Sequence, residues 1–235
     1  MKIRRILPIL LGVVMLGGCA HKNESGKKAI ESYSQALSDS IRNVTAEIDS
    51  CNDVSTTLTD KINNLLPEFR AVEKSREVEG YMIFQGWENK YPLTSTGLVA
   101  RLSASRQLEL VAVLKGGNFD QIRVNGPQSS ASSSVVPNDQ ALNYRQDGMN
   151  TVMFTGKEAD EVANLIADNE LNPVTVTFLN NGKTVGSYKL PHDNAKMITM
   201  TYLLYSTQKE QMGVAQKSIL LGEKLKLLRE HQENK

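Results

Sequence analysis

The residue best placed for covalent chemistry in this sequence is Cys19, which follows a short apolar segment. Three of the first five residues are positively charged, and a largely apolar run of 11 residues follows from Ile6 to Leu16. Gly17 and Gly18 precede the cysteine. A basic start, a short apolar stretch and small residues before a cleavage position are typical of a secretory signal. The run is too short for a transmembrane helix, which needs about 20 residues.

The four residues Leu16-Gly17-Gly18-Cys19 resemble the lipobox of bacterial lipoproteins. The resemblance implies that residues 1–18 are a signal peptide and that Cys19 is acylated, with palmitate among the acyl chains. It also implies a cell-envelope protein that is held to a membrane by its lipid. Ala20, in place of an aspartate, resembles an outer-membrane sorting signal. The whole chain is similar to uncharacterised Bacteroidales-type envelope lipoproteins, and this likeness implies no activity. A plain secretory signal with a coincidental cysteine is the alternative.

Other residues that could carry chemistry are few and scattered. Cys51 has no partner if Cys19 carries lipid, and it falls at an apolar helix position where cysteine packs as a small hydrophobic side chain. The three histidines, His21, His192 and His231, lack the spacing of metal ligands. No phosphate-binding loop and no Gly-x-Ser-x-Gly motif is present in the sequence. We therefore expect no catalytic residue, no metal and no cofactor, and we expect a protein that is not an enzyme.

The charge balance argues against a nucleic-acid partner. From Cys19 onward the chain carries 24 basic and 26 acidic residues. Proteins that neutralise phosphates normally show an excess of clustered lysine and arginine. The partners that remain are the membrane, through the N-terminal lipid, and an envelope protein or a glycan.

A heptad pattern predicts a long helix over residues 27–78. Apolar residues recur every seven positions from Ile30 to Val72, and a second set interleaves four residues later from Ser34 to Phe69. Eleven of these 13 positions are apolar, which is typical of a coiled-coil seam. Pro67 predicts a break near Leu66, because proline inside a helix costs about 3 kcal/mol. We expect the helix to resume as far as residue 77.

Residues 79–192 predict a small antiparallel β-rich domain with one short helix. Alternating apolar residues over 98–102 and 108–114 predict a hairpin, and Asn181-Gly182 predicts a second one between 174–178 and 184–190. The alternation favours sheets with one buried and one solvated face. Three further strands and a helix that begins with a capping box at Thr155–Glu158 are also expected: 81–87, 121–124 and 151–154, and the helix 158–168. The serine-rich segment 125–140 is expected to be a loop.

A second long helix is predicted over residues 193–235, with Asp193 or Asn194 as its cap. Its main apolar seam is expected at near-heptad spacing, with a second stripe beside it. The seam contains Met200, Leu204, Val214, Leu221, Leu225 and Leu228, and the second stripe contains Ile198, Tyr205, Met212 and Ile219. The predicted fold is therefore α+β, with two long helices that form an antiparallel coiled-coil stalk flanking the β-rich domain. The expected divisions are the signal peptide, a tether, the first stalk helix, the tip domain and the second stalk helix: 1–18, 19–26, 27–78, 79–192 and 193–235. Pairing of these helices between copies, which would give a homo-oligomer, is the alternative to the intramolecular pair.

One cluster in the tip domain favours ligand binding. Trp87 and Tyr91 lie among polar residues between two predicted strands, and Arg101 follows on the next strand. Aromatic faces beside amides and charges can stack on sugars or peptides. The alternative is that Trp87 anchors the core of the small domain.

Three functional hypotheses follow from these patterns. The first is a non-enzymatic envelope lipoprotein that presents its small domain for protein or glycan binding. The second is a structural accessory subunit of an envelope assembly, which binds through its helices. The third is an enzyme whose site has no recognisable motif.

Overall fold

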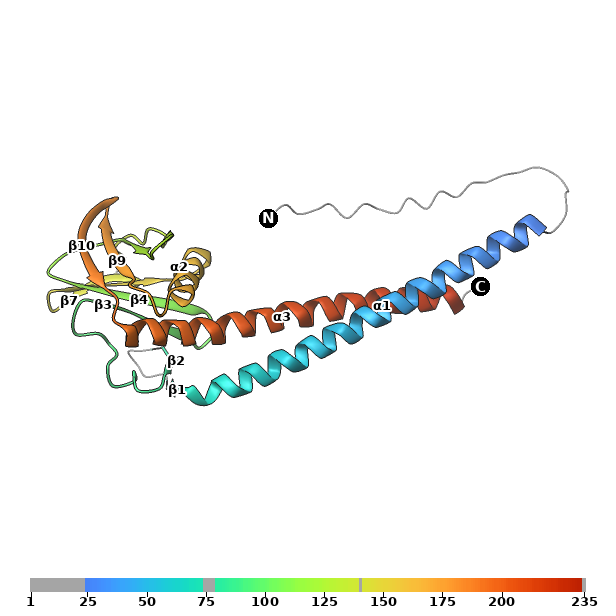
Figure 1. The fold of residues 1–235 in the computed structure, drawn as a ribbon, viewed down its shortest axis with the longest axis horizontal. Coiled ribbons are helices and arrows are strands. Elements are labelled where there is room, and N and C mark those ends of the chain that lie inside the picture. The colour runs from blue at the N-terminus through green and yellow to red at the C-terminus, as the bar shows by residue number, and fades with distance from the viewer. Residues whose placement is uncertain (1–23, 74–78, 140, 234–235) are drawn as a thin grey trace. The chain divides into compact units, whose positions relative to one another are not determined.

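The structure is a computed structural model that describes residues 24–73, 79–139 and 141–233. This part of the chain contains three α-helices and ten strands, which confirms the α+β class. Figure 1 shows how they are arranged along the chain. The helices are α1 (Glu24–Leu65), α2 (Lys157–Asp168) and α3 (His192–Glu233). No described helix has the length and hydrophobicity needed to cross a membrane. The predicted lipidation site, Cys19, lies outside the described residues.

The strands are short and all pair antiparallel. Their bounds are β1 (Phe69–Val72), β2 (Tyr81–Phe84), β3 (Gly97–Ser103), β4 (Leu108–Lys115), β5 (Gln121–Asn125), β6 (Ser130–Ser132), β7 (Asn143–Gln146), β8 (Met149–Phe154), β9 (Thr175–Asn180) and β10 (Lys183–Lys189). One sheet has the order β1-β2-β3-β4-β8-β7 and the other has the order β10-β9-β5-β6.

The chain divides into two compact units, and both long helices contribute to each. One unit contains residues up to Ala46 and from Glu223 onward, and the other is Glu47–Gly222. In the first, the Tyr33 hydroxyl and His231 Nε2 are hydrogen-bonded at 2.6 Å. In the second, Gln211 Nε2 donates to Thr59 Oγ1 at 2.7 Å. Segments of α1 and α3 therefore lie beside each other within each unit.

The heptad pattern predicts the buried side of α1 but not its end. Leu37, Val44, Cys51 and Leu58 are buried as expected, whereas Ile30 is 67% exposed. The helix ends at Leu65 and a 3₁₀ turn, η1 (Leu66–Glu68), contains the helix-breaking proline.

The prediction that this helix resumes beyond Pro67 is wrong for the described residues. Residues Phe69–Val72 form β1 instead, and the Phe69 ring packs edge-on against Phe84 with ring centroids 5.8 Å apart. Phe69 therefore continues the heptad spacing in the sequence but packs within a sheet.

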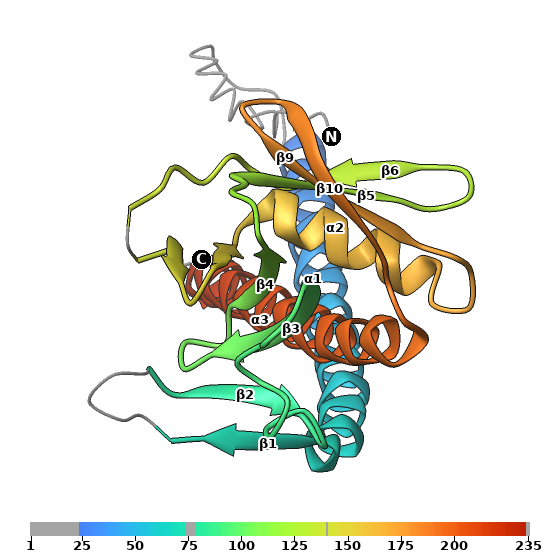
Figure 2. The same cartoon turned by 90° about the vertical axis from the view of Figure 1, so that its left-hand side faces the viewer.

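One hydrophobic core joins both sheets, α2 and the beginning of α3. Figure 2 shows α2 between the two sheets, and it contacts β4 on one side and β5 and β6 on the other. Its apolar stripe, which includes Val162 and Ile166, is fully buried, as the sequence predicts. Phe119 links the sheets by packing against Phe178 at 4.9 Å and Phe154 at 6.4 Å between ring centroids.

The two predicted hairpins are confirmed. Leu98 pairs with Ala112 and Leu102 with Leu108, and the second hairpin turns at Asn181-Gly182, where both residues have positive φ. Only glycine and a few polar residues such as asparagine adopt that conformation readily.

Other details of the β-rich region differ from the prediction. Strands β3 and β4 are buried on both faces, not on one. The serine-rich loop contains a strand, β6, and β7 was not expected at all. The residue that caps α2 is Gly156, whose lack of a side chain excludes the predicted capping box with Thr155.

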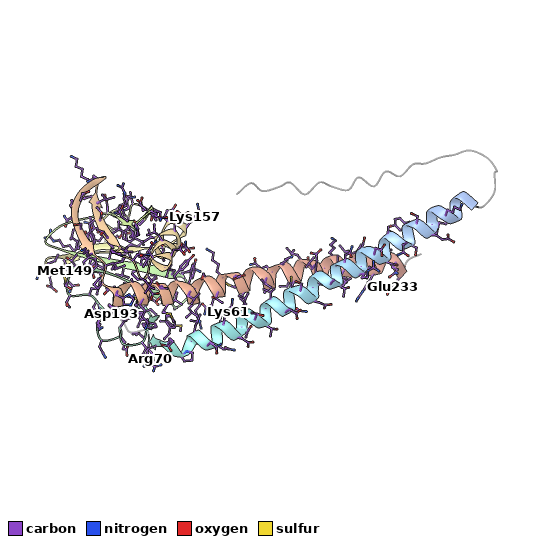
Figure 3. All side chains as sticks on the ribbon, in the orientation of Figure 1. Lys61, Arg70, Met149, Lys157, Asp193 and Glu233 are labelled. Carbon is purple, nitrogen blue, oxygen red and sulfur yellow. The ribbon has the colours of Figure 1, made fainter. Side chains whose placement is uncertain are left out.

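The N-terminal part of α3 packs in the core and so differs from a helix that only pairs with α1. The helix begins at His192, so Asp193 and Asn194 lie inside it and do not precede it as caps. Asn194 Nδ2 instead donates to the Leu98 carbonyl oxygen at 3.0 Å, and Met197 and Ile198 are fully buried. Figure 3 shows the dense packing of side chains around the two sheets near Asp193.

The outward side of α3 was predicted less well than its seam. The predicted second stripe is buried at Ile198 and Tyr205, but Met212 is 55% exposed and Ile219 is 64% exposed. The main seam positions Val214 and Leu221 are partly buried. The side chains of this second stripe are therefore buried near the beginning of the helix and exposed farther along it.

We expect Ile198→Ala to lower the free energy of unfolding by about 2–5 kcal/mol, because it leaves a cavity in the shared core. Met212→Ala, on the exposed side of the same helix, should change it by less than about 0.5 kcal/mol. Urea denaturation followed by circular dichroism measures both. Equal effects of the two substitutions would contradict the packing of α3 described above.

Candidate functional site

The predicted cluster of Trp87, Tyr91 and Arg101 is largely an internal one. Trp87 is only 7% exposed and belongs to the hydrophobic core, with Lys90 Nζ 4.8 Å from the centroid of its ring. Its burial agrees with the alternative given above, in which the tryptophan anchors the small domain. Little of the indole is therefore exposed for stacking, although Trp87 lines a pocket of about 310 Å³ together with Lys90 and Tyr188.

Arg101 is buried and paired within the protein. Its Nε donates to Glu109 Oε2 at 2.6 Å, and the two residues face each other across β3 and β4. The guanidinium lies 4.6 Å from the ring centroid of Tyr81 and 5.2 Å from that of Tyr91. Such stacking and pairing offset the cost of burying a charge. The structure thus brings Tyr91 and Arg101 together, but as part of the packing on one face of the sheet.

The surroundings also affect the acidity of the tyrosine. Burial raises the pKa of Tyr91 to about 12, although the Arg101 charge acts in the opposite direction. The phenol is therefore neutral at physiological pH. Its chemistry is that of a packing and hydrogen-bonding group.

The remaining sequence candidates do not converge. His192 Nδ1 contacts the Glu170 carbonyl oxygen at 3.4 Å, whereas His231 pairs with Tyr33. Cys51 is a buried free cysteine, which agrees with the packing role expected for it. Within the described residues, no group of His, Cys, Asp or Glu side chains is arranged to hold a metal ion. His21 lies outside the described part of the chain.

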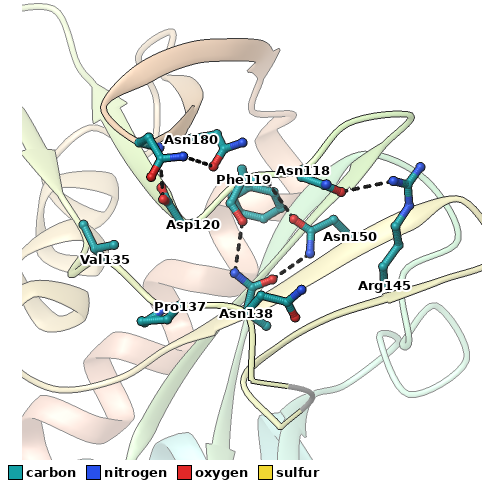
Figure 4. Close-up of a pocket in the computed structure, with 11 residues that line it drawn as sticks. Asn118, Phe119, Asp120, Val135, Pro137, Asn138, Arg145, Asn150 and Asn180 are labelled. Atoms are coloured by element: carbon teal, nitrogen blue, oxygen red, sulfur yellow. Dashed lines mark hydrogen bonds between the residues drawn. The ribbon is translucent and has the colours of Figure 1, made fainter.

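A polar pocket of about 400 Å³ opens elsewhere in the β-rich region. Its lining residues come from the β4–β5 loop, the segment after β6, the β9–β10 turn and strands β7 and β8. Figure 4 shows these side chains around the pocket. Its volume is within the range of about 300–1,000 Å³ that small-molecule sites occupy. Six asparagines contribute to the lining: Asn118, Asn138, Asn143, Asn150, Asn180 and Asn181.

Asn143 and Asn150 form a buried frame behind the pocket. Each is only 4% exposed, and Asn150 Nδ2 donates to Asn143 Oδ1 at 2.8 Å. Asn143 Nδ2 donates to the carbonyl oxygens of Val136 and Phe119, and Asn150 Oδ1 accepts the Phe119 N–H at 2.7 Å. This network fastens two loops to β7 and β8. Buried polar groups that are satisfied in this way fix a unique local conformation.

Asp120 fixes another wall of the pocket. Its Oδ2 accepts the Asn181 N–H at 3.0 Å, which holds the β9–β10 turn in place. Its own backbone is fixed on both sides, because its N–H donates to the Leu179 carbonyl oxygen and its carbonyl oxygen accepts the Val136 N–H. The carboxylate therefore positions the turn through Oδ2, whereas its buried Oδ1 has no hydrogen-bond partner among the described residues.

The groups that remain accessible around the pocket are mostly neutral and polar. Asn118, Asn138 and Asn181 are exposed, and Arg145 Nη1 donates to Asn118 Oδ1 at 3.3 Å. Val135 is 58% exposed and adds an apolar rim together with Pro137. The arrangement can donate and accept several hydrogen bonds at once, which suits recognition better than bond cleavage.

Sequence reasoning missed this pocket because its residues are spread over five segments. The sequence predicts Asn181 as a turn residue, which the structure confirms. The feature of the sequence that could have indicated the pocket is the number of asparagines at the ends of short strands. Only the sheet order, which places β7 next to β8 and β9 next to β5, shows which of those ends meet.

Comparison of the chain with models of protein families, with curated proteins and with solved structures found no match.

We expect Arg101→Leu to lower the free energy of unfolding by about 3–5 kcal/mol, because Glu109 would remain as an uncompensated carboxylate in a mostly buried site. The double variant Arg101→Leu/Glu109→Leu should be more stable than this single variant, since it removes both charges. Urea denaturation of the two single variants and the double variant measures the coupling. If the loss of unfolding free energy in the double variant equals the sum of the losses in the two single variants, Arg101 and Glu109 do not act as a coupled pair.

Proposed function

We propose that this protein is a lipid-anchored, non-enzymatic envelope protein that binds its partner through the asparagine-lined pocket. The observation that carries the binding role is the combination of a rigid buried frame with exposed amides on the open side of the pocket. A preorganised set of polar groups loses little conformational entropy when a ligand binds. The pocket replaces the Trp87 cluster as the binding surface of the tip domain.

The anchoring part of the proposal comes from the sequence. The basic start, the apolar run and Cys19 support export followed by acylation. More than one acyl chain would be needed for stable attachment, because a single chain binds a membrane only weakly. Ala20 favours the outer membrane as the destination.

We also propose that α1 and α3 act as an antiparallel coiled-coil stalk. Support comes from the buried heptad positions Leu37, Val44, Cys51 and Leu58 and from the contacts between the two helices within each unit. In this proposal, the stalk connects the lipidated end of the chain to the β-rich region, while α2 belongs to the β-rich region alone.

A second candidate function is that of an accessory subunit that binds through its helices. Met212, Ile219 and Leu220 on α3 are each more than half exposed. Exposed apolar side chains on a long helix are a common feature of protein–protein contacts. The same side chains would serve self-association into a homo-oligomer.

We expect the wild-type protein and a Cys51→Ala variant to incorporate an alkyne-tagged palmitate in cells and to sediment with membranes. A Cys19→Ser variant should do neither, because it lacks the thiol that is acylated. Gel fluorescence after click labelling, together with membrane fractionation, measures both properties. Labelling of the Cys19→Ser variant would overturn the proposed anchor.

The binding surface can be located by photo-cross-linking in the native envelope. A photo-reactive amino acid in place of Asn138 should cross-link to a partner, and the same amino acid in place of Asn89, which is exposed outside the pocket, should not. Mass spectrometry of the adducts identifies what is bound. Cross-links at Met212 with none at Asn138 would contradict the pocket proposal and favour the accessory subunit.

A further inference from the structure

We propose that the ligand of the asparagine-lined pocket is an uncharged oligosaccharide. This inference rests on the proposed binding function and assigns its ligand class. It follows from four properties of the pocket: the chemistry of its exposed groups, its charge, its apolar rim and its rigidity.

The exposed polar groups match hydroxyl groups. An asparagine amide both donates and accepts hydrogen bonds, as a sugar hydroxyl does. Asn118, Asn138 and Asn181 offer such amides from three separate segments around one cavity. A ligand that carries several hydroxyls on one ring can satisfy groups that converge from different directions.

The charge of the lining favours a neutral ligand. Asp120 and Arg145 are the charged residues among those that line the pocket, so the formal charges cancel. The Asp120 carboxylate accepts from the β9–β10 turn through Oδ2, and its Oδ1 is buried and has no hydrogen-bond partner among the described residues. The Arg145 guanidinium donates to the neutral amide oxygen of Asn118. A polyanion such as a nucleic acid normally meets several basic side chains, and this pocket offers one.

The apolar rim suits the carbon–hydrogen face of a sugar ring. Val135 and Pro137 lie on the same segment after β6 and on one side of the pocket in Figure 4. The opposite side carries Asn118 and Arg145. A pyranose ring has the same division between an apolar face and a polar edge.

An extended peptide is the less favoured ligand. Peptides that bind in extended form usually add to a free strand edge and gain main-chain hydrogen bonds along it. Strand β7 ends the six-stranded sheet and contributes Asn143 and Arg145 to the lining, but most of the other lining residues lie in loops, and several of these present side-chain amides. Its frame, Asn143 and Asn150, is buried and already saturated by internal hydrogen bonds, so it holds the exposed amides in position.

The test uses the full chain in detergent on three arrays: neutral oligosaccharides that include N-acetylglucosamine oligomers, acidic oligosaccharides, and uncharged peptides. We expect binding to members of the neutral set. Asn118→Ala and Asn138→Ala should each weaken that binding by up to about tenfold, the loss expected for one or two net hydrogen bonds. Asn89→Ala, which changes an exposed asparagine outside the pocket, is the matched control and should bind as the wild type does. Urea denaturation verifies that the variants remain folded.

The other outcomes separate this inference from the function on which it rests. Preference for acidic oligosaccharides, weakened by Arg145→Gln, would overturn the neutral assignment. Binding of peptides alone, weakened by Asn138→Ala, would overturn the glycan assignment and leave the pocket as a binding site. Binding to none of the arrays would overturn the glycan inference, and the cross-linking at Asn138 would then decide the proposed function by itself.

Discussion

The β3–β4 hairpin is the element on which the remaining structure depends, because it is buried on both faces. Helix α3 binds backbone groups of β3: Asn194 donates to the Leu98 carbonyl oxygen, and the Ala100 N–H donates to the Met197 sulfur at 3.3 Å. Helix α2 contacts β4, and the buried Arg101–Glu109 pair of the hairpin is packed against tyrosine rings. A strand pair covered in this way cannot change register without exposing apolar side chains and separating the paired charges. It therefore provides a fixed reference for the strands beside it.

The order of the strands relative to the β3–β4 hairpin determines where the residues of the pocket lie. Strand β8 pairs with β4, and β7 pairs with β8, which brings Asn143 and Asn150 to the outer part of the six-stranded sheet. Their amides then bind the loop that leads from β4 to β5 and the segment that follows β6. Asp120 connects the same region to the β9–β10 turn of the second sheet. The side chains around the cavity are thus positioned by both sheets, although most of them lie in loops.

Local features of the fold could be predicted from the sequence, whereas long-range ones could not. The β3–β4 and β9–β10 hairpins depend on alternation and on turn residues that are adjacent in the chain. The end of α1 depends on Pro67, although the same heptad spacing falsely suggested that a helix continues through Phe69. Strand β7 was missed even though Asp147-Gly148, which have positive φ, join it to β8. A dipeptide of this kind predicts a hairpin only when both flanking strands are recognised, and β7 is only four residues long.

The binding site was harder to predict than the fold, because the same residue type can bind a ligand when it is exposed and serve packing when it is buried. Trp87, Tyr91 and Arg101 have the chemistry of a sugar-binding surface, but the indole is buried in the core and the guanidinium is paired inside the protein. Asparagine, which usually indicates a turn, serves here in two ways. Two asparagines are buried where their amides replace water as partners of the backbone, and others remain exposed around the cavity. Since an amide carries no charge, burying it costs far less than burying an ion, provided that its hydrogen bonds are made. A frame of amides can therefore stand directly behind an open pocket without bringing a charge to it, and this allows such a pocket to select ligands by the geometry of their hydroxyls.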